Sequence, residues 1–168
     1  MKPLLIVKTG STYPAIQQQF GDFDDWLQST CACEHVLYQV WLPELEPPPE
    51  PTAFSGVIIT GSPAMVTEQK DWMRSAAQWL LTVMERDIPV LGICFGHQLL
   101  AYALGGVVDY HPLGREIGTV SIALTDLSAD DDLFATLPIC FNAHVTHAQS
   151  VRVLPCGAKV LGGNAFEP

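Results

Sequence analysis

The sequence predicts an α/β domain, a three-layer α/β/α sandwich with a mostly parallel central sheet. Short apolar runs rich in strand-forming residues alternate with segments whose apolar residues recur at helical spacing. Strands that are buried on both faces and separated by helices need crossover connections, and these connections place helices on both sides of the sheet. With 168 residues, 48% of them hydrophobic, the chain can bury one sizeable core. We therefore expect a single domain over residues 1–168.

The first part of the chain contains strand-like runs separated by one helical segment and one loop. Four apolar residues after the turn at residues 9–14 follow three- and four-residue spacing, which predicts one helix against one side of the sheet. Residues 43–51 are rich in proline and glutamate, and we expect an exposed loop there because proline cannot donate a ladder hydrogen bond. The expected strands are residues 4–7, 36–41 and 56–60, and the expected helix face is Ile16, Phe20, Phe23 and Leu27.

The middle of the chain repeats a strand–turn–helix unit, and the rest turns to strands. A helix is expected from Trp72, and the apolar run at residues 89–93 leads directly into a second helix over residues 94–104. Gly105 and Gly106 close that helix as a C-terminal cap. The inner face of the first helix is expected to hold Ala76, Leu80, Val83 and Met84, and further strands are expected at residues 119–124, 151–154 and 159–161.

Charge and composition exclude several classes of partner. Eighteen acidic residues against eight basic ones give a formal net charge of -10, which repels nucleic acid and anionic lipid surfaces. Gly, Pro or a charge interrupts every apolar run, so no membrane-spanning segment is expected. The turn at residues 9–12 lacks the lysine of a phosphate-binding loop, and no cofactor is expected. The odd number of cysteines, five, does not fit a disulfide framework and favours the reducing cytoplasm.

Two strand ends carry the residues with the clearest chemical meaning. In open α/β sheets, ligands bind beyond the carboxyl ends of the strands, and here these ends are residues 60–63 and 92–96. Cys94 stands where a strand becomes a helix and has Gly two residues away on each side, as in a nucleophile elbow. The positive end of the helix dipole is expected to favour its thiolate. The backbone amides of Phe95 and Gly61 could stabilise an oxyanion formed on an attacked carbonyl.

Other interpretations of the cysteines and histidines are weaker. A lone cysteine at a strand end is commonly an inert packing residue, and only the flanking glycines and the immediate helix favour Cys94 as a nucleophile. His144 and His147 lie near Cys140 in the sequence, but zinc sites usually add a second tight pair of ligands. Cys31 and Cys33 likewise lack partners. We expect no metal site.

Several motifs resemble those of one family, the class I glutamine amidotransferases, and most closely its GMP-synthetase-like branch. The run G-I-C-F-G-H-Q at residues 92–98 looks like the family's G-x-C-x-G-x-Q elbow, and T-G-S-P at residues 60–63 is similar to its oxyanion loop. The run G-R-E-I-G at residues 114–118 resembles a G-R-E-x-G segment. Residues 147–151 followed by 154–158 resemble an H-x-D-x-V…L-P-x-G-A stretch.

The resemblance implies a flavodoxin-like fold and a specific reaction. Cys94 would attack the side-chain amide of L-glutamine or another γ-glutamyl amide, release ammonia and leave a thioester that water hydrolyses. Gly61 and Phe95 would supply the oxyanion amides. The ammonia would pass to an acceptor, held in some cases by a separate synthetase chain. The residues implied to contact the substrate are Ser62, Gln98, His147 and Gln149.

The sequence departs from the family pattern in two places. Family members complete the nucleophile with His and Glu in an H-P-E motif, whereas this sequence ends at residues 164–168 without one, so we expect those residues beyond its end. His97, His144 and His147 are expected to have structural roles instead. Gln149 stands where many members have Asp, which leaves room for a γ-glutamyl peptide as substrate.

Three alternatives stay open at this point. One is a γ-glutamyl peptide hydrolase with the same nucleophile. Another is the wider cysteine-elbow superfamily of PfpI-like proteases and deglycases, although those generally carry His directly after the nucleophile, where this chain has Phe95. The third is a binding module that keeps the fold without catalysis. Replacing Cys94 would distinguish the enzymes from the binding module.

Overall fold

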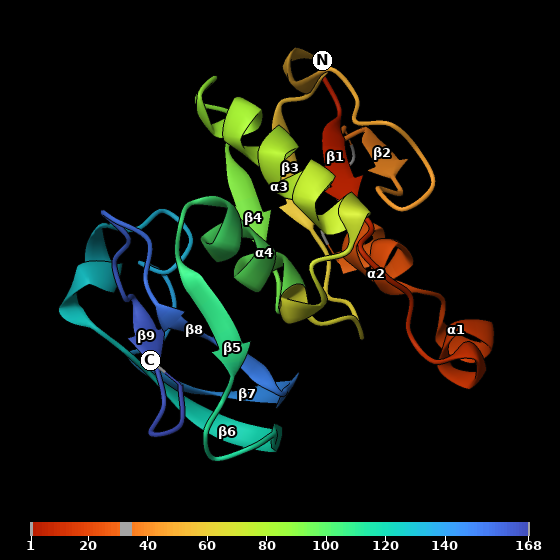
Figure 1. The fold of residues 1–168 in the computed structure, drawn as a ribbon. Coiled ribbons are helices and arrows are strands. Elements are labelled where there is room, and N and C mark those ends of the chain that lie inside the picture. The colour runs from red at the N-terminus through yellow and green to blue at the C-terminus, as the bar shows by residue number, and fades with distance from the viewer. Residues whose placement is uncertain (1, 31–34, 168) are drawn as a thin grey trace.

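The computed structural model describes residues 2–30 and 35–167, so Cys31 and Cys33 lie outside the described residues. The strands are β1 (Leu4–Val7), β2 (Tyr38–Trp41), β3 (Gly56–Ile59), β4 (Val90–Gly92), β5 (Val107–Tyr110), β6 (Glu116–Leu124), β7 (Cys140–His147), β8 (Gln149–Val153) and β9 (Gly162–Gly163). The α-helices are α1 (Pro14–Phe20), α2 (Phe23–Thr30), α3 (Asp71–Met84) and α4 (Phe95–Ala103), shown in Figure 1. Short 3-10 helices cover Pro51–Ala53, Val66–Glu68 and Asp126–Asp130.

A parallel four-stranded sheet in the order β2-β1-β3-β4 forms the centre of the fold. The strand order changes direction at β1, and right-handed crossovers then place the β1–β2 and β3–β4 connections on opposite faces of the sheet. The inward side chains of α3 pack on this sheet, because Ala76, Leu80 and Val83 are almost wholly buried. Figure 1 shows α3 lying across the sheet with α4 beside it. The predicted α/β fold is thus confirmed.

The expected single helix after the first strand is instead two helices. Gly21, with φ of 79°, ends α1, and α2 begins two residues later at Phe23. The positive φ breaks the helical path, because such a conformation favours glycine. Neither helix contains a buried residue, and Phe20 on α1 is 63% exposed. The prediction that this segment covers the sheet with one continuous apolar face is therefore wrong, and α1 projects away from the body (Figure 1).

The second half of the chain forms antiparallel strands beside the parallel sheet. β5 pairs with β8, and β6 pairs with β7 along most of its length and with β9 at its end. The strands expected at residues 119–124 and 151–154 correspond to β6 and β8. The strand expected at residues 159–161 is wrong, since the pairing falls on the next two residues, Gly162–Gly163. Met84 is also 38% exposed rather than on the inner face of α3.

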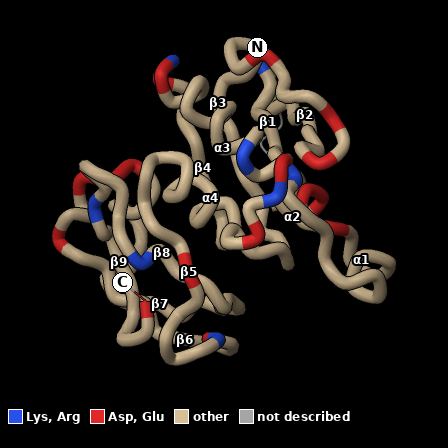
Figure 2. Tube along the Cα trace, viewed as in Figure 1, with Lys and Arg blue, Asp and Glu red and all other residues tan. Residues whose placement is uncertain are grey.

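Asp and Glu occur in several separate groups along the trace, and Lys and Arg are fewer (Figure 2). Within the described residues, no helix reaches the length and apolar character that crossing a bilayer requires. The helix expected over residues 94–104 ends as predicted, because Gly105 has φ of 87° and donates to the Tyr102 carbonyl while Gly106 donates to the Ala101 carbonyl. This pair of hydrogen bonds is the Schellman arrangement that satisfies the last carbonyls of a helix.

Candidate active site

The two strand ends identified in the sequence lie side by side at the carboxyl edge of the parallel sheet. β3 and β4 are neighbours, and Ile59 is paired with Gly92 at their ends. A methyl group on Gly96 would lie 2.5 Å from the carbonyl oxygen of Ile59. A methyl group on Gly92 would lie 2.6 Å from the Gly96 carbonyl. The glycines on both sides of Cys94 are therefore needed because strand and helix backbones approach each other too closely for a side chain.

Cys94 occupies the turn between β4 and α4 in a strained conformation. Its φ of 53° and ψ of -108° lie in a region that side-chain-bearing residues rarely adopt, and α4 begins at the next residue. Such a conformation costs of order 1–3 kcal/mol and persists where the surroundings enforce it. The side chain is exposed, and its Sγ lies 3.9 Å from the Thr146 carbonyl oxygen. This is the geometry of a nucleophile elbow.

The electrostatic setting of the thiol differs from the expectation. Although the residue is exposed overall, neighbouring groups partly desolvate the sulfur and raise the pKa of the Cys94 thiol, whereas the Phe95 amide lowers it by a smaller amount. Among the described residues, no histidine or carboxylate hydrogen-bonds the Sγ. Desolvation thus opposes the effect expected from the helix terminus, and a thiolate at Cys94 stays a prediction.

A hydrogen-bonded loop holds the other strand end beside Cys94. Thr9 donates from its backbone amide to the Thr60 hydroxyl at 3.1 Å and from its hydroxyl to the Thr60 carbonyl at 3.0 Å. Both threonines are buried. A methyl group on Gly61 would lie 3.7 Å from the Cys94 Cβ, which places this backbone next to the thiol. Within the described chain, the amides of Gly61 and Phe95 donate to no backbone carbonyl.

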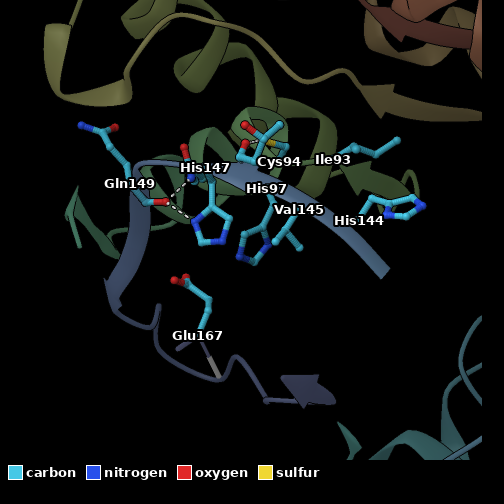
Figure 3. A pocket seen from close by; sticks show the side chains of 10 residues that line it. Ile93, Cys94, His97, His144, Val145, His147, Gln149 and Glu167 are labelled. Atoms are coloured by element: carbon cyan, nitrogen blue, oxygen red, sulfur yellow. Dashed lines mark hydrogen bonds between the residues drawn. The ribbon is translucent and has the colours of Figure 1, made fainter. Parts of the chain in front are cut away.

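A hollow of about 370 Å³ opens beside Cys94 and brings together most of the predicted site residues (Figure 3). Its walls come from the start of α4, from β7 and β8, and from the last residues described. The lining residues are Ile93, Cys94, His97, Gln98, His144, Val145, Thr146, His147, Gln149 and Glu167.

Ser62 does not line this hollow. Its hydroxyl donates to the Thr9 carbonyl at 2.9 Å and accepts from the Ala64 amide at 3.1 Å, so it orders the loop. A substrate contact by Ser62 stays a prediction. The loop instead borders a second, smaller hollow of about 180 Å³ formed with α2, which Gly61 and Ile93 help to line.

Gln98 and Gln149 form a buried polar link behind the hollow. The Gln98 side-chain amide donates to the Gln149 carbonyl at 2.7 Å. The Gln149 side chain accepts from the Val66 amide at 3.0 Å and donates to the Thr67 hydroxyl at 2.5 Å. Both glutamines are nearly fully buried, so these bonds satisfy groups that would otherwise be costly to bury. Gln149 therefore ties β8 to the 3-10 helix Val66–Glu68.

His147 is fixed by partners that sequence analysis did not assign. Its Nε2 lies 3.0 Å from Glu116 Oε2, and its Nδ1 lies 3.3 Å from the Gln149 carbonyl oxygen. Asn164 donates to the other Glu116 oxygen at 2.9 Å. Glu116 and His147 face each other directly in the β6–β7 register, but this pairing was not predicted because β7 was not recognised as a strand. Glu116 and Asn164 are thus the supporting residues that the sequence analysis missed.

The histidine pair does not form a metal site with its neighbours. The His144 ring nitrogen Nδ1 is 2.9 Å from the Thr119 hydroxyl, and His147 is held by Glu116. In residues 2–30 and 35–167, no group of three or more His, Cys, Asp or Glu residues is arranged to hold a metal ion.

Comparison with known proteins identifies the family. Residues 25–167 match the family described as glutamine amidotransferase class-I. The chain belongs to this family. A GMP synthase (glutamine-hydrolyzing) of Thermomicrobium roseum is 38% identical over 139 residues, which are 81% of this chain and 23% of that protein. One subunit of the GMP synthase (glutamine-hydrolyzing) of Saccharolobus solfataricus is 35% identical over 74% of this chain and 62% of that protein.

Solved structures of amidotransferases share the fold. The crystal structure of a glutamine amidotransferase from Methylobacillus flagellatus superposes with a TM-score of 0.78 at 25% identity and covers 99% of this chain and 63% of that one. A glutamine amidotransferase from Thermotoga maritima gives a TM-score of 0.77 at 20% identity. The chain spans less than two thirds of the length of these curated relatives and of the Methylobacillus structure. The class I amidotransferase resemblance seen in the motifs is confirmed.

Proposed function

We propose that this chain hydrolyses the side-chain amide of L-glutamine or a related γ-glutamyl amide through Cys94 and releases ammonia. The observation that carries the proposal is the strained turn that presents the Cys94 Sγ to a hollow, with the amides of Gly61 and Phe95 beside it and free of backbone acceptors. Membership of the class I amidotransferase family supports the same chemistry.

The reaction follows from this geometry. The Cys94 sulfur attacks the γ-carbonyl carbon, and the carbonyl oxygen becomes an oxyanion that the amides of Gly61 and Phe95 stabilise. Collapse of this intermediate breaks the carbon–nitrogen bond, and the nitrogen leaves as ammonia after it takes up a proton. Water then attacks the thioester, which restores the thiol and releases glutamate. Removing one oxyanion donor costs roughly 3 kcal/mol in comparable enzymes.

The walls of the hollow suggest how substrate is held. Gln98 and Gln149 are tied to each other and fix the position of β8 against α4, while the Glu116 contact holds the His147 ring at the rim. A volume of about 370 Å³ suits a small amino-acid ligand. We infer that Gln98, His147 and Gln149 shape the pocket mainly by orienting backbone and rim, because their side-chain polar groups already have partners.

The acceptor of the ammonia is proposed to lie on a separate synthetase chain. Support comes from the Saccharolobus relative, which is itself one subunit of a GMP synthase. We place the reaction in the cytoplasm, because Cys94, Cys140 and Cys156 are all free and exposed, a state that a reducing compartment maintains.

Covalent labelling tests the proposal. A chloroketone analogue of glutamine is incubated with the protein, and the adduct is located by mass spectrometry. We expect saturable labelling of Cys94 that free glutamine slows. Cys140 and Cys156 are exposed thiols in the same chain and serve as internal controls. Labelling of these cysteines at the same rate as Cys94, or no protection by glutamine, would overturn the proposal.

A further inference from the structure

Glu167 is an acidic side chain that lines the same hollow as Cys94. The residue is partly buried, and its Oε2 atom is fully enclosed with no hydrogen-bond partner among the described residues. A carboxylate oxygen removed from water without a compensating donor is costly, so an atom of this kind points to a polar partner that the described residues do not supply. The residues that line the hollow include no Lys or Arg to neutralise it.

Hydrogen bonds order the backbone around Glu167 and so fix the position from which its side chain extends. Asn164 Oδ1 accepts from the backbone amides of Phe166 at 2.8 Å and Glu167 at 2.7 Å. The backbone amide of Asn164 donates to the Glu167 carbonyl at 2.8 Å. The Phe166 ring stacks on His111 with centroids 3.9 Å apart. β9 leads into this turn and is paired with β6. These contacts fix the turn from both sides.

His97 is the titratable neighbour that could balance the carboxylate, but its charge state is wrong for this role. Burial lowers the pKa of the His97 imidazole, and the opposing effect of Glu167 is smaller. A neutral ring near pH 7 supplies no positive charge opposite the Glu167 carboxylate. His147, the other ring that edges onto Phe166, is already bound to Glu116.

We propose that Glu167 binds the α-ammonium group of the γ-glutamyl substrate, an assignment that rests on the function proposed above. Figure 3 shows Cys94 and Glu167 on opposite sides of the cluster of lining side chains. A γ-glutamyl group has a reactive carbonyl at one end, which would meet Cys94, and an α-ammonium at the other, which would meet Glu167. A short carbon chain separates the two ends. An ammonium group in the hollow would form a charge-assisted hydrogen bond with the Glu167 carboxylate that lines it. Glu167 thus makes a free α-amine a requirement for tight binding.

A matched pair of electrophiles tests this assignment. One is a glutamine-like chloroketone with a free α-amine, and the other is the same chloroketone without the amine. The inactivation constants KI and kinact for Cys94 are measured by intact mass spectrometry on the wild-type chain and on Glu167→Gln. The control is Glu85→Gln, which makes the same charge change at an exposed position at the end of α3. Circular dichroism verifies that each variant is folded.

We expect Glu167→Gln to raise KI for the amine-bearing reagent by roughly 10- to 100-fold, the usual effect of losing a charged hydrogen bond, with kinact unchanged. KI for the amine-free reagent should stay the same, and Glu85→Gln should change neither. An N-acetylated reagent should bind wild type as weakly as the amine-free one. If Glu167→Gln affects both reagents equally or neither, the Glu167 assignment fails while the proposed function stands. If wild type shows no saturable labelling of Cys94 by either reagent, both fail.

Discussion

The strained conformation of Cys94 makes an unusual prediction about stability. Replacing Cys94 by Gly should make the protein more stable than replacing it by Ala, although Gly normally destabilises a folded chain. At φ of 53° and ψ of -108°, Ala keeps the Cβ that causes the strain, whereas Gly removes it. Relief of strain is worth about 1–3 kcal/mol, and the larger unfolded-state entropy of Gly costs roughly 0.5–1 kcal/mol. The Gly variant should therefore exceed the Ala variant by about 0.5–2 kcal/mol.

Urea denaturation followed by circular dichroism measures this difference directly, and thermal melting should show the Gly variant higher by roughly 1–8 °C. The same Gly and Ala pair at Ser121 in β6, where backbone geometry is ordinary for a strand, is the control and should show Ala more stable. If Cys94→Ala is as stable as or more stable than Cys94→Gly, the turn is not strained, and the elbow argument for the nucleophile loses its physical basis.

Three further changes test other parts of the structure. Burial raises the pKa of Asp22, but hydrogen bonds from the Thr12 amide, Lys8 and the Phe23 amide outweigh this effect and lower the pKa to about 2. Asp22→Asn should therefore lower the free energy of unfolding in urea at pH 7 by about 2 kcal/mol. Because the folded pKa is the lower one, this difference should shrink as pH falls from about 4 toward 2, and a pH-independent difference would contradict it. Gly96→Ala should destabilise the protein by roughly 1–3 kcal/mol or more, since its methyl group meets the Ile59 backbone, and an unchanged midpoint in urea would refute the close approach. The rate of Cys94 alkylation by iodoacetamide should have its pH midpoint above that of N-acetylcysteine, because desolvation raises the pKa of this thiol. A midpoint below that of N-acetylcysteine would contradict the raised pKa.

The elbow could be predicted from the sequence because its requirements are local. Gly92 and Gly96 flank Cys94 because the closely approaching backbones leave no room for a Cβ, and this steric requirement is visible as a pattern in the sequence. The strands β1 and β3 could be predicted equally well, since continuous apolar runs are needed where both faces of a sheet are covered. Most of the parallel sheet and the position of Cys94 could therefore be predicted from local packing rules.

Features that depend on distant partners could not be predicted in this way. The helix expected over one apolar stripe is divided at Gly21, and no residue of the resulting α1 is buried. The ionisation of Cys94 depends on how many groups crowd the thiol, which helix position alone does not reveal. The Glu116–His147 contact depends on the register of two antiparallel strands, and β7 lacks the continuous apolar run that marks a buried strand.

The two sides of the hollow come from different parts of the fold, and this division explains the arrangement of the site. The Cys94 sulfur and the amides of Gly61 and Phe95 belong to the ends of β3 and β4, where the parallel sheet fixes them. The opposing wall comes from β7, β8 and the turn at Asn164, which the antiparallel strands position. Asn164 links the elements of this wall, because it bonds Glu116 through one side-chain atom and the Glu167 turn through the other. A change in the register of β6 and β7 would therefore move the groups proposed to recognise the ligand and leave the turn at Cys94 intact, so the proposed binding and bond-breaking steps can vary independently within one fold.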